Sequence, residues 1–272
     1  ILISGTPALA RPVELWPQLH SLDKDEFGTF SKFTERYCDA KRGRFGWDVK
    51  GISHVEELHS KIQKVMVRHL KSHVLNELPP KQRTIVPVKM DSPIAAGECK
   101  HVLETMNRAR LDVQELHGDD ALYANFEARR LLMNAYQMTG IAKAPAVADF
   151  ILDYLSGSNE KIIVFGHHKE VLTKIEDAIS RKYKGIGHIK IDGDVPPVER
   201  THRVKKFQTC DNVRVALLSV TAAGVGLTLT AASTVIFAEL HWTPGVLAQA
   251  EDRCHRIGQI NAVQVLYCIC KD

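Results

Sequence analysis

The second half of the chain alternates short apolar runs with segments whose apolar residues recur at helical spacing. The apolar runs are residues 161–165, 188–191, 213–218, 235–237 and 263–269. The helical segments are residues 168–183, 198–207 and 245–256. Short strands that alternate with helices of this length predict a parallel sheet with right-handed crossovers. Because the strand runs are apolar throughout, we expect helices on both faces, as in a doubly wound α/β fold.

The first half of the chain predicts mainly helices. Helical periodicity covers residues 98–117 and 121–138, and residues 149–155 are typical of the end of a helix that leads into the sheet. Residues 84–89 are rich in β-formers and are either a connector or a strand. Residues 1–4 are an apolar run typical of the last stretch of a buried strand.

These patterns predict two domains. We expect residues 1–90 to be mostly helical. We expect residues 91–272 to form the α/β domain, with a helical protrusion at about 91–140. The chain opens with Ile1, not Met, inside an apolar run, which we interpret as a sign that it is part of a longer protein.

The composition is that of a folded intracellular protein. Hydrophobic residues make up 44% and charged residues 25% of the chain. No window approaches the run of about 18 apolar residues that a membrane helix needs, so we expect no membrane partner. The six cysteines are scattered without metal-ligand spacing. We therefore expect reduced thiols, no metal site, and a nuclear location in a eukaryote or a cytoplasmic one otherwise.

The charge is uneven along the chain, which changes the picture for the first domain. The net charge is +4, and the excess of basic residues lies within residues 1–90. Lys41, Arg42 and Arg44 are interleaved there with aromatic residues. Such patches attract phosphate backbones through counterion release, although a solvated basic loop explains the same composition.

Two segments of the second domain carry candidate chemistry. Gly224 and Gly226 follow a strand and would let the backbone approach a phosphate, but a tight turn uses glycine equally well. Arg253 and Arg256 are three residues apart, so on a helix they would share one face and form a clamp for a polyphosphate. The alternative is that both arginines are exposed and paired with Glu251 and Asp252.

The order of these motifs resembles the second motor lobe of the Swi/Snf-family DNA translocases, which are superfamily-two helicase-like ATPases. Residues 224–233, 239–244 and 249–259 carry the resemblance to that lobe. Residues 4–7 resemble the motif that ends the family's first lobe, and residues 67–71 with 78–81 resemble the segment that joins the lobes. The resemblance implies that the chain covers the end of lobe one and most of a RecA-like lobe two.

Further segments resemble the HepA-related annealing-helicase branch, which remodels forked DNA. They are residues 36–40, 47–48, 164–168, 191–193 and 237–240. Two positions depart from the pattern. Thr221 or a neighbouring small residue stands where many relatives have an arginine, and His69 stands where relatives often have a second arginine. These departures weaken the transfer of DNA contacts at those positions.

The resemblance implies a role for each candidate residue. Arg253 and Arg256 would be catalytic in the ATP site, Gln249, Gly224 and Gly226 would bind the nucleotide, and Thr6 would couple DNA contact to the ATP site. The implied contacts with DNA are His167, His168, Asp192, Gly193, Thr221, Trp242, Lys41, Arg42 and Arg44.

The 272 residues contain no Gly-x-x-x-x-Gly-Lys-Ser/Thr run. In this family the P-loop and the Mg²⁺ ligands belong to the first lobe. The resemblance therefore implies a parent enzyme that uses ATP and Mg²⁺, and a fragment that does not hydrolyse ATP alone. The first alternative is a nucleosome-remodelling ATPase. The second is a DNA-binding module without catalysis, while the motifs disfavour an RNA helicase.

Overall fold

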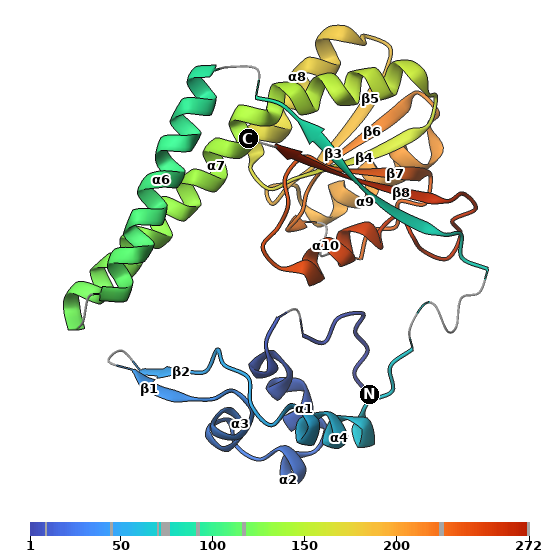
Figure 1. Cartoon of the computed structure of the whole chain (residues 1–272). Coiled ribbons are helices and arrows are strands. Elements are labelled where there is room, and N and C mark those ends of the chain that lie inside the picture. Colours follow the sequence, from blue (N-terminus) through green and yellow to red (C-terminus); the bar gives the residue numbers. More distant parts are fainter. Residues whose placement is uncertain are drawn as a thin grey trace. The chain divides into compact units, whose positions relative to one another are not determined.

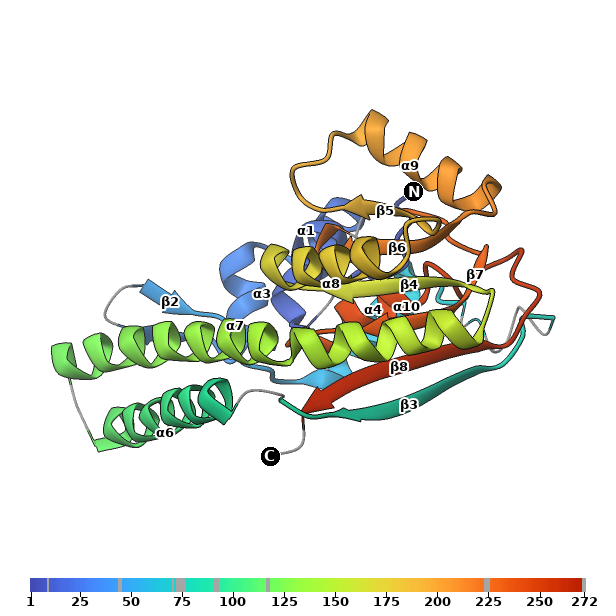
Figure 2. The same cartoon turned by 90° about the horizontal axis from the view of Figure 1, so that it is seen from above.

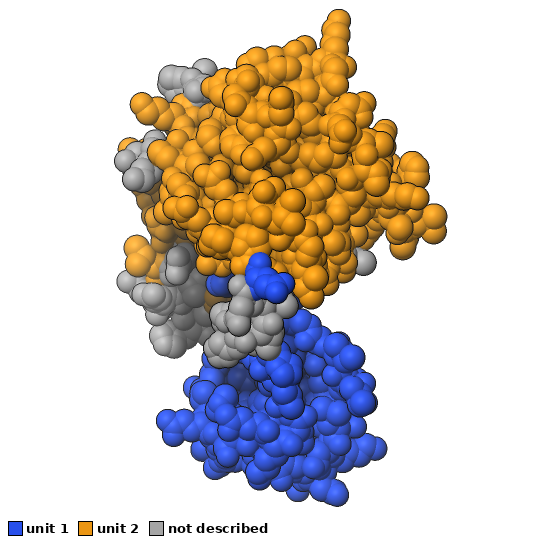
Figure 3. All heavy atoms as spheres, turned by 90° about the vertical axis from the view of Figure 1, so that its right-hand side faces the viewer, with its two compact units in different colours: residues 1–77, 242–249 blue, residues 78–241, 250–272 orange. Residues whose placement is uncertain are grey.

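The computed structural model describes residues 1–8, 10–43, 46–69, 71, 77–90, 93–115, 118–222 and 226–270. The chain divides into two compact units, shown in different colours in Figure 3. Unit 1 comprises residues 1–77 and 242–249, and unit 2 comprises residues 78–241 and 250–272.

Unit 2 is built on a six-stranded parallel sheet in the order β3-β8-β7-β4-β6-β5. The strands are β3 (Lys81–Val88), β4 (Lys161–Gly166), β5 (Gly187–Ile191), β6 (Val213–Ser219), β7 (Ala232–Phe237) and β8 (Val263–Cys270). The central strands β4, β6 and β7 are buried along almost their whole length. Burial on both faces is what their apolar sequences predict, and the expected parallel α/β fold is confirmed.

Three helices contact the sheet (Figure 2): α7 (Gly118–Gly157), α8 (Lys169–Lys182) and α9 (Pro197–Thr209). The inner face of α8 carries four fully buried side chains at helical spacing: Val171, Leu172, Ile175 and Ile179. They share one core with the last turns of α7 and with strands β4, β6, β7 and β8.

Helices α6 (Pro93–Glu115) and α7 lie side by side and extend beyond the sheet (Figure 1). The expected helical protrusion is thus present, but its boundary differs from the prediction. Residues 121–138 and 149–155 belong to one continuous helix, which passes through Pro145. Ala144 and Val147 are both fully buried on either side of that proline, so packing holds the helix together across a residue type that ordinarily interrupts helices.

Residues 84–89 fall largely within strand β3, which settles the two readings in favour of a strand. β3 pairs in parallel with β8 from Lys81 opposite Val263 to Val88 opposite Cys270. Pro87 is tolerated because β3 is an edge strand, whose outer side needs no donor. The sheet of unit 2 therefore includes residues that precede position 90.

Unit 1 is mostly helical, as expected. It contains η1 (Pro12–Leu15), α1 (Trp16–Leu22), α2 (Lys24–Phe27), α3 (Phe30–Tyr37), α4 (Val55–Val65) and the hairpin of β1 (Lys41–Gly43) and β2 (Gly46–Asp48). Its own core consists of Leu19, Phe27, Phe33, Tyr37, Cys38, Leu58 and Ile62.

Residues 1–4 do not form the expected strand. Ile1 and Ile3 are almost fully exposed. A strand needs a neighbouring strand for its backbone groups, and no strand of the described residues pairs with this segment. Across the same residues, no helix combines the length and apolar character needed to cross a bilayer.

Candidate nucleotide and nucleic-acid site

The two candidate arginines do not lie on a helix, which corrects the sequence-based interpretation. Helix α10 (Pro244–Glu251) ends before them, and residues 252–258 form consecutive turns, which we call the arginine turn. Gly258 within it has a φ of 96°, a conformation that favours glycine. Arg253 and Arg256 are therefore placed by the turns and not by helical periodicity.

A buried glutamine fixes the arginine turn. Gln259 is 6% exposed, and its Nε2 donates to the carbonyl oxygens of Ala232 at 2.7 Å, Thr230 at 3.2 Å and Cys254 at 3.3 Å. Its Oε1 accepts a hydrogen bond from the backbone N–H of Asn261 at 3.0 Å. One amide thus joins the turn to the start of β7.

Arg256 reaches the loop that contains the candidate glycines. Its Nη1 donates to the carbonyl oxygens of Gly226 at 3.3 Å and Leu227 at 3.4 Å, and to Thr228 Oγ1 at 3.1 Å. The structure therefore brings Arg256 and Gly226 together, whereas Gly224 lies outside the described residues. The backbone carbonyl of Arg253 also accepts a hydrogen bond from Leu229 N–H at 2.8 Å.

Arg253 and Arg256 are close enough to influence each other electrostatically. Burial lowers the pKa of Arg253, and the positive charge of Arg256 lowers it further, against a smaller opposing effect of Asp252. Two guanidinium groups that repel each other at a partly buried place are a donor set that suits a polyphosphate. This observation supports the fit of a nucleotide to these residues.

The buried carboxylate of Glu251 anchors the start of the turn through partners on β3 that were not recognised in the sequence. Glu251 is 1% exposed, and its oxygens accept hydrogen bonds from Arg83 Nε at 3.0 Å and Nη2 at 2.8 Å. Lys81 Nζ lies 2.8 Å from Oε2, and Tyr267 donates its hydroxyl to Oε1. Burial alone would raise the pKa of Glu251, but these contacts bring that pKa below its usual value. Burial and the bond to Glu251 also raise the pKa of Tyr267 to about 12.

The contacts of Glu251 argue against part of the alternative interpretation, in which this carboxylate pairs with Arg253 and Arg256. Its carboxylate is occupied by Lys81 and Arg83, which are two residues apart on β3 and so face the same side. The signal was available in the sequence as two basic residues at strand spacing. These two residues were not recognised as strand residues because the β-forming residues lie in 84–89 and residues 81–83 are polar.

His167 and His168 follow β4 and meet a second buried carboxylate. Glu239 is 1% exposed, and its Oε2 accepts hydrogen bonds from the backbone N–H groups of His167 at 2.8 Å and His168 at 2.9 Å. The Nδ1 of His168 lies 2.6 Å from Oε1. Burial lowers the pKa of His167, and His168 lowers it further, while Glu239 opposes the shift.

The protruding helix α7 packs against this cluster through Tyr136 and Gly140. The Tyr136 ring lies 5.1 Å from the His167 ring and 4.9 Å from the His168 ring, and its hydroxyl donates to the carbonyl oxygen of Leu240. Gly140 brings the helix so close that an added Cβ would lie 2.2 Å from Glu239 Oε1. The base of the protrusion is thus fixed directly against the strand ends.

Other candidates follow neighbouring strands at the same edge of the sheet. Asp192 and Gly193 come after β5, where Arg200 Nη2 donates to both carbonyl oxygens at 3.3 Å. Thr221 comes after β6 and its Oγ1 lies 2.9 Å from Ser219 Oγ. Because the carboxyl ends of parallel strands meet at one edge, these residues and His167 share the place where α/β sheets bind ligands.

The remaining candidates belong to unit 1 or lie outside the described part. Trp242 is 52% exposed, and Gln249 is partly buried in the last turns of α10. Thr6 donates its backbone N–H to Ser4 Oγ at 3.2 Å. Lys41 and Arg42 are exposed on β1, whereas Arg44 falls outside the described residues. No group of three or more potential metal ligands occurs among the described residues.

Comparisons with known proteins agree with the motif order. Residues 1–96 match the SNF2-related domain, and residues 142–258 match the helicase conserved C-terminal domain. The solved Sulfolobus solfataricus SWI2/SNF2 ATPase core in complex with dsDNA has a TM-score of 0.56 at 23% identity, over 98% of this chain and 56% of that one. The C-terminal part of the Fun30 ATPase domain has a TM-score of 0.55 at 19% identity, over 72% of this chain and 86% of that one. These two likenesses concern the fold.

Two relatives align along the whole chain. The Caenorhabditis elegans "SWI/SNF-related matrix-associated actin-dependent regulator of chromatin subfamily A-like protein 1 homolog" is 42% identical over 100% of this chain. The human "DNA annealing helicase and endonuclease ZRANB3" is 39% identical over 99% of this chain. The chain spans 38% of the first relative and 24% of the second. With both domains matched in the predicted order and such relatives aligned throughout, the chain belongs to the SNF2-related family, as its motifs indicated.

Proposed function

We propose that the chain is the C-terminal part of an ATP-dependent DNA translocase that anneals or remodels forked DNA. The observation that carries the proposal is the arginine turn, where Arg253 and Arg256 lie together beside the loop at Gly226. The names of the relatives support the choice of an annealing helicase. DNA repair and a nuclear location in a eukaryotic cell are part of the same proposal.

In this proposal the arginine turn completes an ATP site that a preceding motor lobe begins. Residues 1–90 contain the end of that first lobe and the connector, and residues 91–272 contain the second lobe. The P-loop lysine and the Mg²⁺ ligands belong to the part of the first lobe that precedes this chain. ATP supplies the phosphoanhydride bond whose hydrolysis drives movement along DNA.

The two arginines act on the negative charge of the phosphates. A planar guanidinium presents its donors in a fixed fork, which matches phosphate oxygens better than a lysine ammonium does. Arg256 is held by the loop at Gly226 and Thr228, so little side-chain freedom is lost when the phosphates bind. Gln249 and Gly224 complete the nucleotide-binding set, and Thr6 couples DNA contact to ATP hydrolysis.

The DNA track follows the carboxyl edge of the sheet. His167, Asp192, Gly193 and Thr221 end the neighbouring strands β4, β5 and β6. His168 acts more as a structural residue, because its Nδ1 lies against the buried Glu239. Further contacts come from Trp242 and from the basic hairpin with Lys41, Arg42 and Arg44.

The experiment uses the natural protein that contains this chain together with its preceding motor lobe. We expect Arg256→Ala to lower DNA-stimulated ATP turnover by about a thousandfold or more while ATP binding changes far less. Arg256→Lys should restore little of that turnover. Arg130→Ala is the matched control, because Arg130 is a 66%-exposed arginine paired with Glu127 on α7.

Melting temperatures of the same preparations separate catalysis from folding. A well-folded Arg256→Ala protein with normal turnover would reject the role of the arginine turn. A wild-type protein that binds DNA without any stimulated turnover would favour the non-catalytic DNA-binding module. Stimulation by nucleosomes well above that by forked DNA would favour a nucleosome remodeller.

A further inference from the structure

The hairpin of unit 1 presents an aromatic ring and a cation on one face. β1 and β2 pair antiparallel with Arg42 opposite Trp47 and Lys41 opposite Asp48. Side chains of residues directly opposite each other lie on the same face of a sheet. Trp47 is 65% exposed, and the described residues of both strands are exposed. The hairpin therefore has one face formed by Arg42 and Trp47 that is open to solvent.

The opposite face has a different character. Lys41 Nζ lies 2.7 Å from Asp39 Oδ2, and Lys41 is opposite Asp48 in the register. Its positive charge is therefore balanced locally. The face of Arg42 and Trp47 combines a large apolar ring with a positive charge, and that combination distinguishes it from an ordinary solvated loop.

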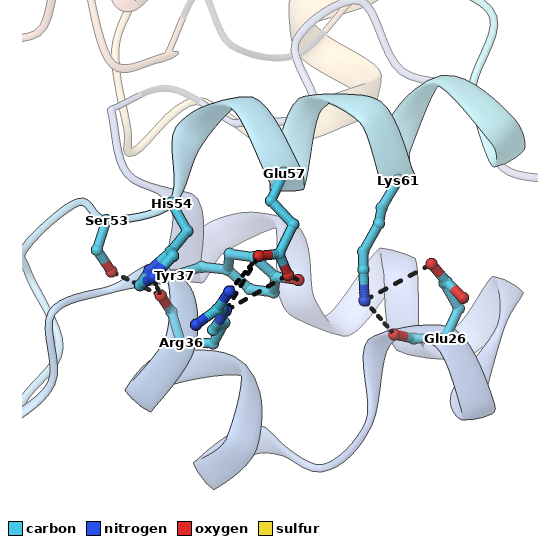
Figure 4. A network of polar contacts seen from close by, with 7 residues as sticks. All are labelled: Glu26, Arg36, Tyr37, Ser53, His54, Glu57 and Lys61. Carbon is cyan, nitrogen blue, oxygen red and sulfur yellow. Dashed lines mark hydrogen bonds and ion pairs between the residues drawn. The ribbon is translucent and has the colours of Figure 1, made fainter.

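The base of the hairpin is held by a polar network between the end of α3 and the start of α4 (Figure 4). Ser53 Oγ donates to the carbonyl oxygen of Arg36 at 2.6 Å and accepts the backbone N–H of Asp39 at 3.3 Å. The Nδ1 of His54 donates to the same Arg36 carbonyl at 2.8 Å. These bonds connect the segment that precedes β1 to the segment that follows β2.

The side chains beneath that network continue the anchoring. Glu57 of α4 pairs with Arg36 of α3 and accepts the hydroxyl of Tyr37 at 2.8 Å. The bonds from Arg36 and Tyr37 lower the pKa of Glu57 to about 2. Lys61 Nζ lies 3.6 Å from Glu26 Oε1, which connects α4 to α2 (Figure 4). The two helices that flank the hairpin are thus fixed to each other.

The backbone on both sides of the hairpin is constrained as well. Asp39 has a φ of 46° and His54 a φ of 47°, which are uncommon values for residues other than glycine. A Cβ added at Gly51 would lie 2.8 Å from the carbonyl oxygen of Cys38, so the segments before and after the hairpin approach closely there. Such backbone persists only where the surroundings determine it, and it is frequent at functional sites. The hairpin extends from the helices of unit 1 as a preformed element (Figure 1).

We propose that the hairpin is a binding site for unpaired DNA bases, on which Trp47 stacks while Arg42 contacts the adjacent phosphate. The proposal rests on the proposed function, which supplies DNA as the substrate. An exposed aromatic ring beside a cation is the arrangement with which proteins bind single strands. In a duplex each base is stacked on its neighbours, so the indole has a partner only where a strand is unpaired. The hairpin thereby distinguishes forked DNA from a blunt duplex.

The test measures binding of the full chain to three fluorescein-labelled probes by anisotropy. The probes are an oligothymidine, a forked duplex with unpaired arms and a blunt duplex of the same paired sequence. We expect Trp47→Ala to weaken binding of the first two probes by about 5- to 100-fold. Binding of the blunt duplex should not change. Trp47→Phe should keep most of the affinity, because a phenyl ring also stacks.

Two further variants sharpen the result. Arg42→Ala should weaken binding of all three probes and reduce the salt dependence by about one phosphate contact. Phe126→Ala is the matched control, because Phe126 is an aromatic residue of the same 65% exposure on α7. It should bind every probe as the unchanged chain does.

The proposal is overturned if Trp47→Ala leaves binding of the oligothymidine and the fork unchanged. In that case the hairpin face is better explained as a contact for another protein. Equal losses on fork and blunt duplex also overturn it. If Trp47→Ala folds poorly, Trp47→Leu decides, because leucine keeps an apolar side chain without an aromatic face and should weaken binding of the first two probes alone. The proposed function fails separately, namely if the natural protein shows no ATP turnover stimulated by either forked or blunt DNA. At saturating DNA that turnover should survive Trp47→Ala.

Discussion

The buried carboxylate of Glu251 provides a sharp test of what holds the arginine turn. Glu251→Gln keeps the size of the side chain and removes its negative charge. The two cations of β3, Lys81 and Arg83, then face a neutral amide. The amide nitrogen of the glutamine also becomes a donor that faces an N–H group of Arg83, which cannot accept a hydrogen bond.

The size of the effect follows from the exposure of each partner. Removing one partner of a fully buried pair costs about 3–5 kcal/mol. Lys81 is 16% exposed, but Arg83 is 52% exposed, so water can solvate the freed guanidinium. We therefore expect a loss of about 2–3 kcal/mol in the free energy of unfolding, after allowing for that screening. For a unit of this size the melting temperature should fall by roughly 5–10 °C.

Thermal and urea unfolding at neutral pH measure this loss directly. Glu170→Gln is the control, because Glu170 is 52% exposed and lies 3.6 Å from Lys174 one turn along α8. That surface pair should contribute about 0.5 kcal/mol or less. A Glu251→Gln protein that melts within about 1 °C of the unchanged chain would refute the reasoning.

The stability difference between the unchanged chain and Glu251→Gln should also depend on pH. The pKa of Glu251 is lower in the folded state than its usual value of 4.5. Its stabilising effect is therefore fully present above that usual value and is lost as the pH falls through the lower, folded pKa. The difference in stability between the unchanged chain and Glu251→Gln should be constant near neutrality and shrink in acid. A difference that grows as the pH falls would contradict the assignment.

The remaining predictions concern close packing and a buried amide. Gly140→Ala should lower stability by about 1–3 kcal/mol in urea unfolding, because the new methyl meets a Glu239 carboxylate held by three hydrogen bonds. Gly97→Ala, in the exposed part of α6 with nothing near the added Cβ, should instead stabilise by up to about 1 kcal/mol. Gln259→Leu should cost about 1–3 kcal/mol, since the carbonyl oxygens of Thr230 and Ala232 lose the amide donor and the N–H of Asn261 loses its acceptor, and thermal melting would detect it.

The parallel sheet could be predicted because its information is local. Strands such as β4 and β6 are apolar runs bounded by polar turns, and α8 shows its buried face at helical spacing. The candidate residues at the carboxyl edge were also accessible, because the ends of parallel strands necessarily meet at one edge. His167, Asp192 and Thr221 were candidates through the family resemblance, and this rule explains why they lie at one edge.

The misplaced boundaries arose where tertiary contacts outweigh local signals. Two separate helical stretches were expected, but buried side chains on both sides of Pro145 keep α7 continuous. The spacing of Arg253 and Arg256 predicts a shared helix face, but the chain leaves the helix after Glu251, and the amide of Gln259 bonds the following turns to the start of β7. The sequence did not indicate which groups the individual buried polar side chains would form hydrogen bonds with.

Both buried carboxylates illustrate why those partners escape sequence reasoning. A glutamate is almost never fully buried unless it is paired, so by residue type alone Glu239 and Glu251 read as surface positions. Each is 1% exposed because its partners arrive from segments far away in the chain. Glu239 accepts two backbone N–H groups at the start of α8, donors that every residue except proline possesses and that leave no mark in the sequence. Glu251 pairs with charged side chains on β3, which do leave a mark, and its partners could have been found once β3 was recognised as a strand.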